Sequence, residues 1–135
     1  MLRFNYTKYG LSSRPIIPIV ISYRNKSIEE SVLIDSGADT CILDAGVATF
    51  LGIDHFSAPK QIIGGLGNAQ YQSFTHPVKM AIGSHSFRVN ANFIYGISKK
   101  HEYGILGQKG FFENFIVSFN LRNNEIKINP SKKKK

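Results

Sequence analysis

Val32-Leu33-Ile34-Asp35-Ser36-Gly37-Ala38-Asp39-Thr40 places an aspartate directly after an apolar segment of the 135-residue chain. The apolar residues predict a buried strand, and Asp35 follows at the point where that strand leaves the core. Ser36 can hydrogen-bond locally, and Gly37 permits a tight turn with close backbone approach. Such a turn can hold a carboxylate at the rigid floor of a cleft, although Asp-Ser-Gly by itself is also common turn chemistry.

The rest of the chain predicts many short strands and little helix, which indicates an all-β fold in one domain over residues 1–130. We expect strands at 16–21, 28–34, 40–43, 60–63, 70–74, 78–82, 86–93, 116–120 and 125–128. Asp44 is a plausible N-cap for a short helix at 45–51 that Gly52 ends. A second short helix is expected at 109–114.

Three further motifs accompany the Asp-Ser-Gly stretch. They are Arg14-Pro15 before the first long strand, the glycine-rich Ile62-Ile63-Gly64-Gly65-Leu66-Gly67, and the apolar Gly104-Ile105-Leu106-Gly107. Over residues 14–115 this combination resembles the retropepsin family, the dimeric aspartic proteases of retroviruses, retroelements and some bacteria. The glycine-rich segment is similar to the family's flap, and the Asp-Ser-Gly stretch to its catalytic loop. The resemblance implies a retropepsin-like closed β-barrel with a flap hairpin and one or two short helices.

The chemistry of aspartic proteases explains why a second chain is needed. Hydrolysis requires two carboxylates that share one proton, because like charges at hydrogen-bonding distance cannot both ionise. The ionised carboxylate acts as general base on a water, and the protonated one donates to the scissile carbonyl oxygen, with no metal or cofactor. This chain has a single Asp-Ser/Thr-Gly motif. We therefore expect a homodimer with the active site on its twofold axis.

The resemblance also implies a role for each matching residue. The residues expected to be catalytic are Asp35, Ser36 and Gly37. The residues expected to bind a peptide or protein substrate are Ala38, Asp39, Ile42, Ile63, Gly64, Gly65, Leu66, Tyr103 and Ile105. The residues expected at the dimer interface are Arg14, Ser36 and Leu66, with Arg14 paired to Asp39 of the partner subunit.

Two features depart from the family pattern. Gln108 follows Gly107 where the family usually has an arginine, so Asp39 would depend more on Arg14. The chain also continues through 116–128, beyond the length of the compact retroviral enzymes, so its interface strands could differ from theirs. The alternative to an aspartic endopeptidase is therefore a retropepsin-like dimerisation or peptide-binding module with little activity.

The net charge of +8 raises a third possibility, a nucleic-acid-binding barrel. Four of the cations belong to the terminal lysine run, and we expect a solvated, disordered tail at 131–135. The chain lacks a basic-aromatic RNA-binding motif, and such a barrel would leave Asp35 unexplained. We therefore expect no nucleic-acid partner. The longest apolar run near the start is too short for a membrane span, and we expect a cytoplasmic protein.

The other reactive side chains predict no further site. Cys41, the single cysteine, has no histidine beside it in sequence, so a buried inert thiol is expected. The histidines at 55, 76, 85 and 101 show no metal-ligand spacing. We therefore expect no metal site.

Overall fold

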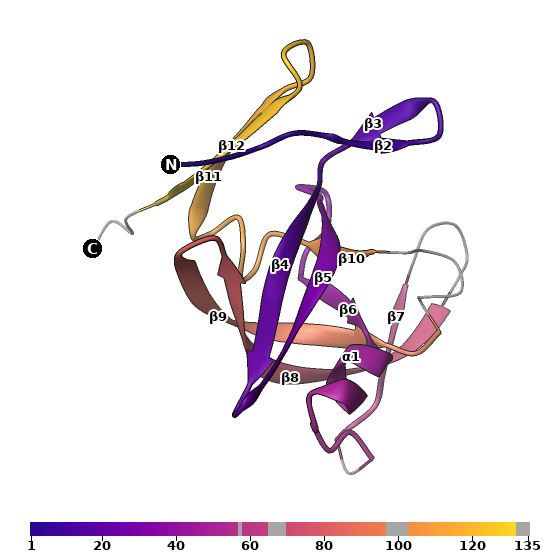
Figure 1. Ribbon diagram of the computed structural model, residues 1–135. Helices are drawn as coiled ribbons and strands as arrows, with labels where there is room; N and C mark the ends of the chain where they lie inside the picture. Colours follow the sequence, from indigo (N-terminus) through magenta and orange to yellow (C-terminus); the bar gives the residue numbers. More distant parts are fainter. Residues whose placement is uncertain (57, 65–69, 97–102, 132–135) are drawn as a thin grey trace.

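The computed structural model describes residues 1–56, 58–64, 70–96 and 103–131, and this part of the chain consists mainly of strands (Figure 1). In chain order the strands are β1 (Leu2–Phe4), β2 (Thr7–Tyr9), β3 (Ser12–Arg14), β4 (Ile16–Tyr23), β5 (Lys26–Ile34), β6 (Ile42–Asp44), β7 (Gln61–Gly64), β8 (Gln70–Ile82), β9 (His85–Ile94), β10 (Gly104–Leu106), β11 (Phe115–Asn120) and β12 (Glu125–Pro130). Among the described residues, α1 (Ala45–Phe50) is the only helix. The predicted all-β class is confirmed.

Seven of the strands form one sheet that closes on itself. Their order is β4-β5-β10-β6-β9-β8-β7, and an additional pairing of β4 with β8 completes a ring. Neighbours in the ring are antiparallel except at β5–β10 and β6–β9, which are parallel. Among the described residues β7 pairs only with β8, so it stands outside the ring. The structure is thus a closed β-barrel with one attached hairpin strand.

Buried and exposed residues alternate along β4, and the buried ones fill the barrel interior. Ile17, Ile19 and Ile21 are buried, whereas Pro18 and Val20 between them are exposed. Burying each isoleucine contributes about 1.5–3 kcal/mol relative to leaving it in water. The core is completed by aromatic side chains from β8, β9 and the turn after β10, namely Phe74, Phe93 and Phe111.

The first predicted helix is confirmed and the second was wrong. Asp44 caps α1 by accepting the Gly46 N–H at 2.7 Å, and Gly52 follows the helix with a φ of +78°. Residues 109–114 form turns instead of a helix. Gly110 has a φ of +96°, which is incompatible with a right-handed helix.

The segments 70–74 and 78–82, predicted as two strands, belong to the single strand β8. Pro77 lies between the residues that pair with β7 and those that pair with β4. In that interval β8 has only β9 as a neighbour, so proline, which has no N–H to donate, is tolerated.

The two ends of the chain meet in a three-stranded sheet of order β1-β12-β11 (Figure 1). Leu2 of β1 lies opposite Ile128 of β12, and Phe4 lies opposite Ile126. The β11–β12 hairpin matches the prediction, whereas β1, β2 and β3 were not predicted. Strands of three residues offer too few positions for an alternating pattern to be recognised.

Two further predictions concern the C-terminal lysine tail and membrane-spanning segments. The lysines at 132–135 of the predicted tail lie outside the described residues. Within the ranges that the structure describes, no helix has the length and apolar character needed to cross a bilayer.

Candidate active site

Asp35 is the first residue after β5, one of the strands that form the barrel wall. Its N–H donates to the Leu106 carbonyl at 3.0 Å, which extends the parallel pairing of β5 with β10. Its side-chain Oδ1 accepts the Gly37 N–H at 2.9 Å, in the kind of turn where an aspartate bonds the backbone two residues on. The residue is half-buried. The loop therefore holds the carboxylate in a defined, partly exposed position.

The backbone after β10 braces residues 35–40, which we call the Asp35 loop. The Gln108 N–H donates to the Ala38 carbonyl at 2.9 Å, and the Lys109 N–H donates to the Asp39 carbonyl at 3.0 Å. These two bonds continue the contact that β10 makes with β5. Two segments about 70 residues apart in sequence are thus locked together beside the carboxylate.

Gly107 makes this close approach possible. A Cβ at this residue would lie 2.2 Å from the Thr40 carbonyl oxygen and 2.7 Å from that of Ala38, so neither oxygen leaves room for a side chain. Next to it, the side-chain Nε2 of Gln108 donates to the Ser36 carbonyl at 2.9 Å. The uncharged amide at position 108, which departs from the family's arginine, therefore still braces the loop.

Four of the predicted substrate-binding residues lie in two separate places. Ile42 of β6 lies directly opposite Ile105 of β10, and both are half-buried next to the end of β5. Ile63 and Gly64 lie on β7, the strand attached outside the ring, where Ile63 is half-buried and Gly64 is exposed. Gly65 and Leu66, which were also predicted to bind substrate, lie outside the described residues.

Two tyrosines hold Arg14. Its Nη1 donates to the Tyr103 hydroxyl at 2.7 Å, and its guanidinium carbon lies 4.3 Å from the centre of the Tyr9 ring. The two rings meet edge to face with centroids 5.9 Å apart. Within the described part of one chain, Asp39 makes no ion pair. The pairing of Arg14 with Asp39 of the partner subunit stays a prediction.

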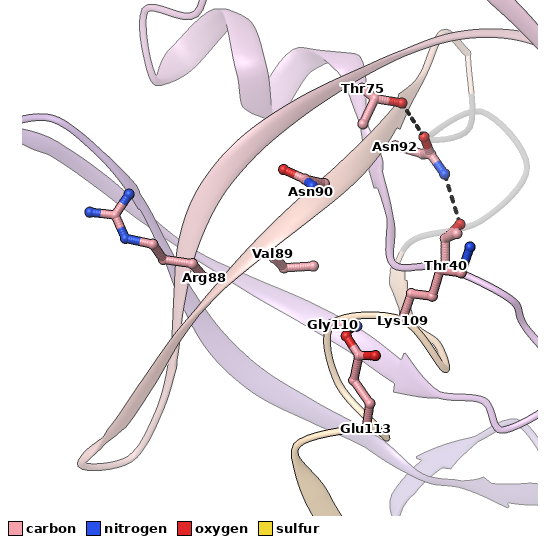
Figure 2. A pocket seen from close by; sticks show the side chains of 9 residues that line it. All are labelled: Thr40, Thr75, Arg88, Val89, Asn90, Asn92, Lys109, Gly110 and Glu113. Atoms are coloured by element: carbon pink, nitrogen blue, oxygen red, sulfur yellow. Dashed lines mark hydrogen bonds between the residues drawn. The ribbon is translucent and has the colours of Figure 1, made fainter. Parts of the chain in front are cut away.

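A pocket of about 440 Å³ lies beside the loop, between β9 and the turn after β10 (Figure 2). Its lining includes Thr40, Asn90, Asn92 and Lys109, none of which was predicted as a site residue. The sequence feature that could have indicated this site is Asn92, a polar residue that interrupts the apolar run 91–94. In the structure its side chain is only partly exposed. A polar side chain in such a place normally has a hydrogen-bond partner.

Cys41 directly follows the loop and is fully buried, as predicted. Its Sγ donates to the Lys109 carbonyl at 3.5 Å. Burial raises the pKa of the Cys41 thiol to about 11, so the thiol stays protonated at neutral pH. A protonated, enclosed sulfur is a weak nucleophile.

No family model and no curated protein matches the sequence. Among solved structures, the chain is similar to EIAV protease complexed with the inhibitor HBY-793, with 24% identity and a TM-score of 0.52 over 76% of this chain and 88% of that one. It is also similar to a retropepsin-like aspartic protease from Rickettsia conorii, with 18% identity and a TM-score of 0.62 over 93% of this chain and 86% of that one. The closed strand ring and both likenesses lead to one conclusion: the chain has the fold of the retropepsin-like aspartic proteases.

Proposed function

We propose that the protein is an aspartic endopeptidase whose active site forms between two copies of the chain. The observation that carries the proposal is the Asp35 carboxylate, which Gly37 holds at the end of β5 in a retropepsin-like fold. One chain supplies one such carboxylate, and the hydrolytic chemistry needs two. A second copy, related by a twofold axis, supplies the other.

In this proposal the two Asp35 carboxylates share one proton. The ionised carboxylate takes a proton from a water molecule, and that water attacks the carbonyl carbon of the scissile peptide bond. The protonated carboxylate donates its proton to the carbonyl oxygen, which gives a tetrahedral diol intermediate. The proton taken from water then passes to the amide nitrogen, the C–N bond breaks, and one hydroxyl of the intermediate returns its proton to the second carboxylate, which leaves the acid and amine products and a dyad with one proton. Ser36 and Gly37 keep the two carboxylates aligned, because both lie in the turn that fixes Oδ1.

Substrate binding in this proposal uses the residues around the loop. Ile42 and Ile105, which face each other across β6 and β10, contribute apolar surface for substrate side chains. Main-chain contacts come from Ala38 and Asp39, whose loop is braced by the turn after β10. Ile63 and Gly64 begin the hairpin that we propose as the flap, together with residues 65 and 66. Tyr103 completes this set of contacts.

The proposed dimer interface includes Arg14, Ser36 and Leu66. Arg14 is held between Tyr9 and Tyr103, so little side-chain freedom remains to be lost when a partner carboxylate binds it. The carboxylate that we propose as its ligand is the partner subunit's Asp39. This ion pair would supply the charge that Gln108 cannot.

Dilution is expected to lower the activity per chain. Only the dimer contains a complete active site, so below the dimer dissociation constant a tenfold dilution should reduce specific activity about tenfold. The measurement is the cleavage rate of a diverse peptide mixture over a dilution series, with sedimentation of the same samples. A monomer with full turnover at every concentration would contradict the shared site. A dimer that binds peptides without cleaving them would instead favour the binding module.

A further inference from the structure

Three polar side chains from three separate segments form a continuous hydrogen-bond chain beside the Asp35 loop (Figure 2). The Thr75 hydroxyl of β8 donates to Asn92 Oδ1 of β9 at 2.6 Å. Asn92 Nδ2 then donates to the hydroxyl of Thr40 at 2.7 Å. Thr40 closes the stretch that begins at Asp35. We call this arrangement the Thr75–Asn92–Thr40 chain.

Asn92 is chemically suited to the middle position. Its amide offers an acceptor and a donor on the same planar group, so it can accept from one threonine and donate to the other. A leucine of similar size would break both bonds. It would also leave the half-buried Thr40 hydroxyl without its donor.

The Thr75–Asn92–Thr40 chain holds the loop that carries Asp35 from a second side. The backbone bonds to Ala38 and Asp39 come from the turn after β10, so they hold the loop from one side. Asn92 holds Thr40 from the β9 side. Thr75 lies two residues beyond the part of β8 that pairs with β7. The same side chains therefore connect the loop to the base of the β7–β8 hairpin.

We propose that Asn92 is a positioning residue, which fixes the Asp35 loop relative to the β7–β8 hairpin through Thr40 and Thr75. This inference rests on the proposed proteolytic function, in which the loop carries the catalytic group and the hairpin forms the flap. The side chain of Asn92 bonds Thr40 and Thr75, so in this proposal it acts through these two threonines and not on the reacting atoms. Displacement of a catalytic group by about 1 Å can cost about a hundredfold in rate, so one lost anchor can be measurable.

Asn90 provides a matched control. It is an asparagine on the same strand, two residues away, and it lines the same pocket. It is exposed, and within the described residues its side chain makes none of the hydrogen bonds that Asn92 makes. Figure 2 shows Asn90 apart from the Thr75–Asn92–Thr40 chain. Asn90→Leu therefore makes the same chemical change without removing an anchor.

The experiment compares Asn92→Leu, Thr40→Val, Thr40→Ser and Asn90→Leu with the wild type. We expect Asn92→Leu and Thr40→Val to lower kcat about tenfold, with a smaller change in KM. Thr40→Ser keeps the hydroxyl and should restore the wild-type rate, and Asn90→Leu should leave it unchanged. The double variant Asn92→Leu with Thr40→Val should be no slower than Asn92→Leu alone, because that substitution already removes the bond to Thr40.

Amide hydrogen exchange gives a second readout that does not depend on activity. The N–H groups of Gln108 and Lys109, which donate to the loop, should exchange about tenfold faster in Asn92→Leu than in Asn90→Leu. Unchanged exchange would overturn the proposal, whether or not the wild type cleaves peptides. Multiplicative losses in the double variant would also overturn it. If the wild type is inactive but the amides of Asn92→Leu exchange faster, the positioning role stands and the proteolytic function fails.

Discussion

Asp35→Asn is expected to abolish peptide cleavage, with a loss of at least about a thousandfold in kcat. The asparagine side chain is nearly isosteric, and its Oδ1 can still accept the Gly37 N–H that shapes the turn. An amide, however, cannot take a proton from water at neutral pH. The variant should therefore keep the fold and melting temperature of the wild type while losing activity. Cleavage assays and thermal unfolding monitored by circular dichroism measure the two properties.

Asp54→Asn is the matched control for this change. Asp54 is exposed, and its Oδ1 accepts the Phe56 N–H two residues on, at 3.1 Å, in the same pattern as Asp35 and Gly37. The substitution therefore makes the same local change away from the barrel loop, and the cleavage rate should not change. A folded Asp35→Asn protein that cleaves at the wild-type rate would rule out the aspartic mechanism.

Gly107→Ala is expected to produce a large loss of stability. The added Cβ would lie 2.2 Å from the Thr40 carbonyl oxygen, which belongs to a backbone braced on both sides. Relief requires movement of the Asp35 loop or of the turn after β10. We expect the free energy of unfolding to fall by about 3 kcal/mol or more and the melting temperature by about 10 °C.

Gly64→Ala serves as the stability control for Gly107→Ala. Gly64 lies on β7, and a Cβ there would have no atom of the described residues within 4 Å. Thermal and urea unfolding of the two variants should therefore differ strongly. Equal melting temperatures would show that the contact between the turn after β10 and the Asp35 loop is not as close as described.

Local signals in the sequence were sufficient for the Asp35 turn and for the barrel strands other than β10, which was not among the expected strands. The alternation along β4 and the apolar residues before Asp35 depend on burial, which leaves a pattern in consecutive residues. The α1 cap was equally local, because Asp44 and Gly52 lie at the two ends of the helix. The turn at 109–114 was missed because the positive φ of Gly110 reflects its tertiary setting, where Val89 would contact any added Cβ.

Contacts between distant segments could not be predicted in the same way. Arg14 and Tyr103 are 89 residues apart, and Asn92 and Thr40 are 52 residues apart. Nothing near these residues in sequence identifies their partners, because the barrel closure brings them together. β1 was missed for a related reason, since it is a strand only by pairing with β12 at the other end of the chain.

The most direct test of a site shared by two chains is the activity of mixed dimers. Wild type and Asp35→Asn are combined in varying proportions at a fixed total concentration well above the dimer dissociation constant, and subunits are allowed to exchange. If each active site needs Asp35 from both chains, activity should follow the square of the wild-type fraction and reach about one quarter in an equal mixture. Activity that falls linearly, to about one half in the equal mixture, would show that one chain carries a complete site and would contradict the shared dyad.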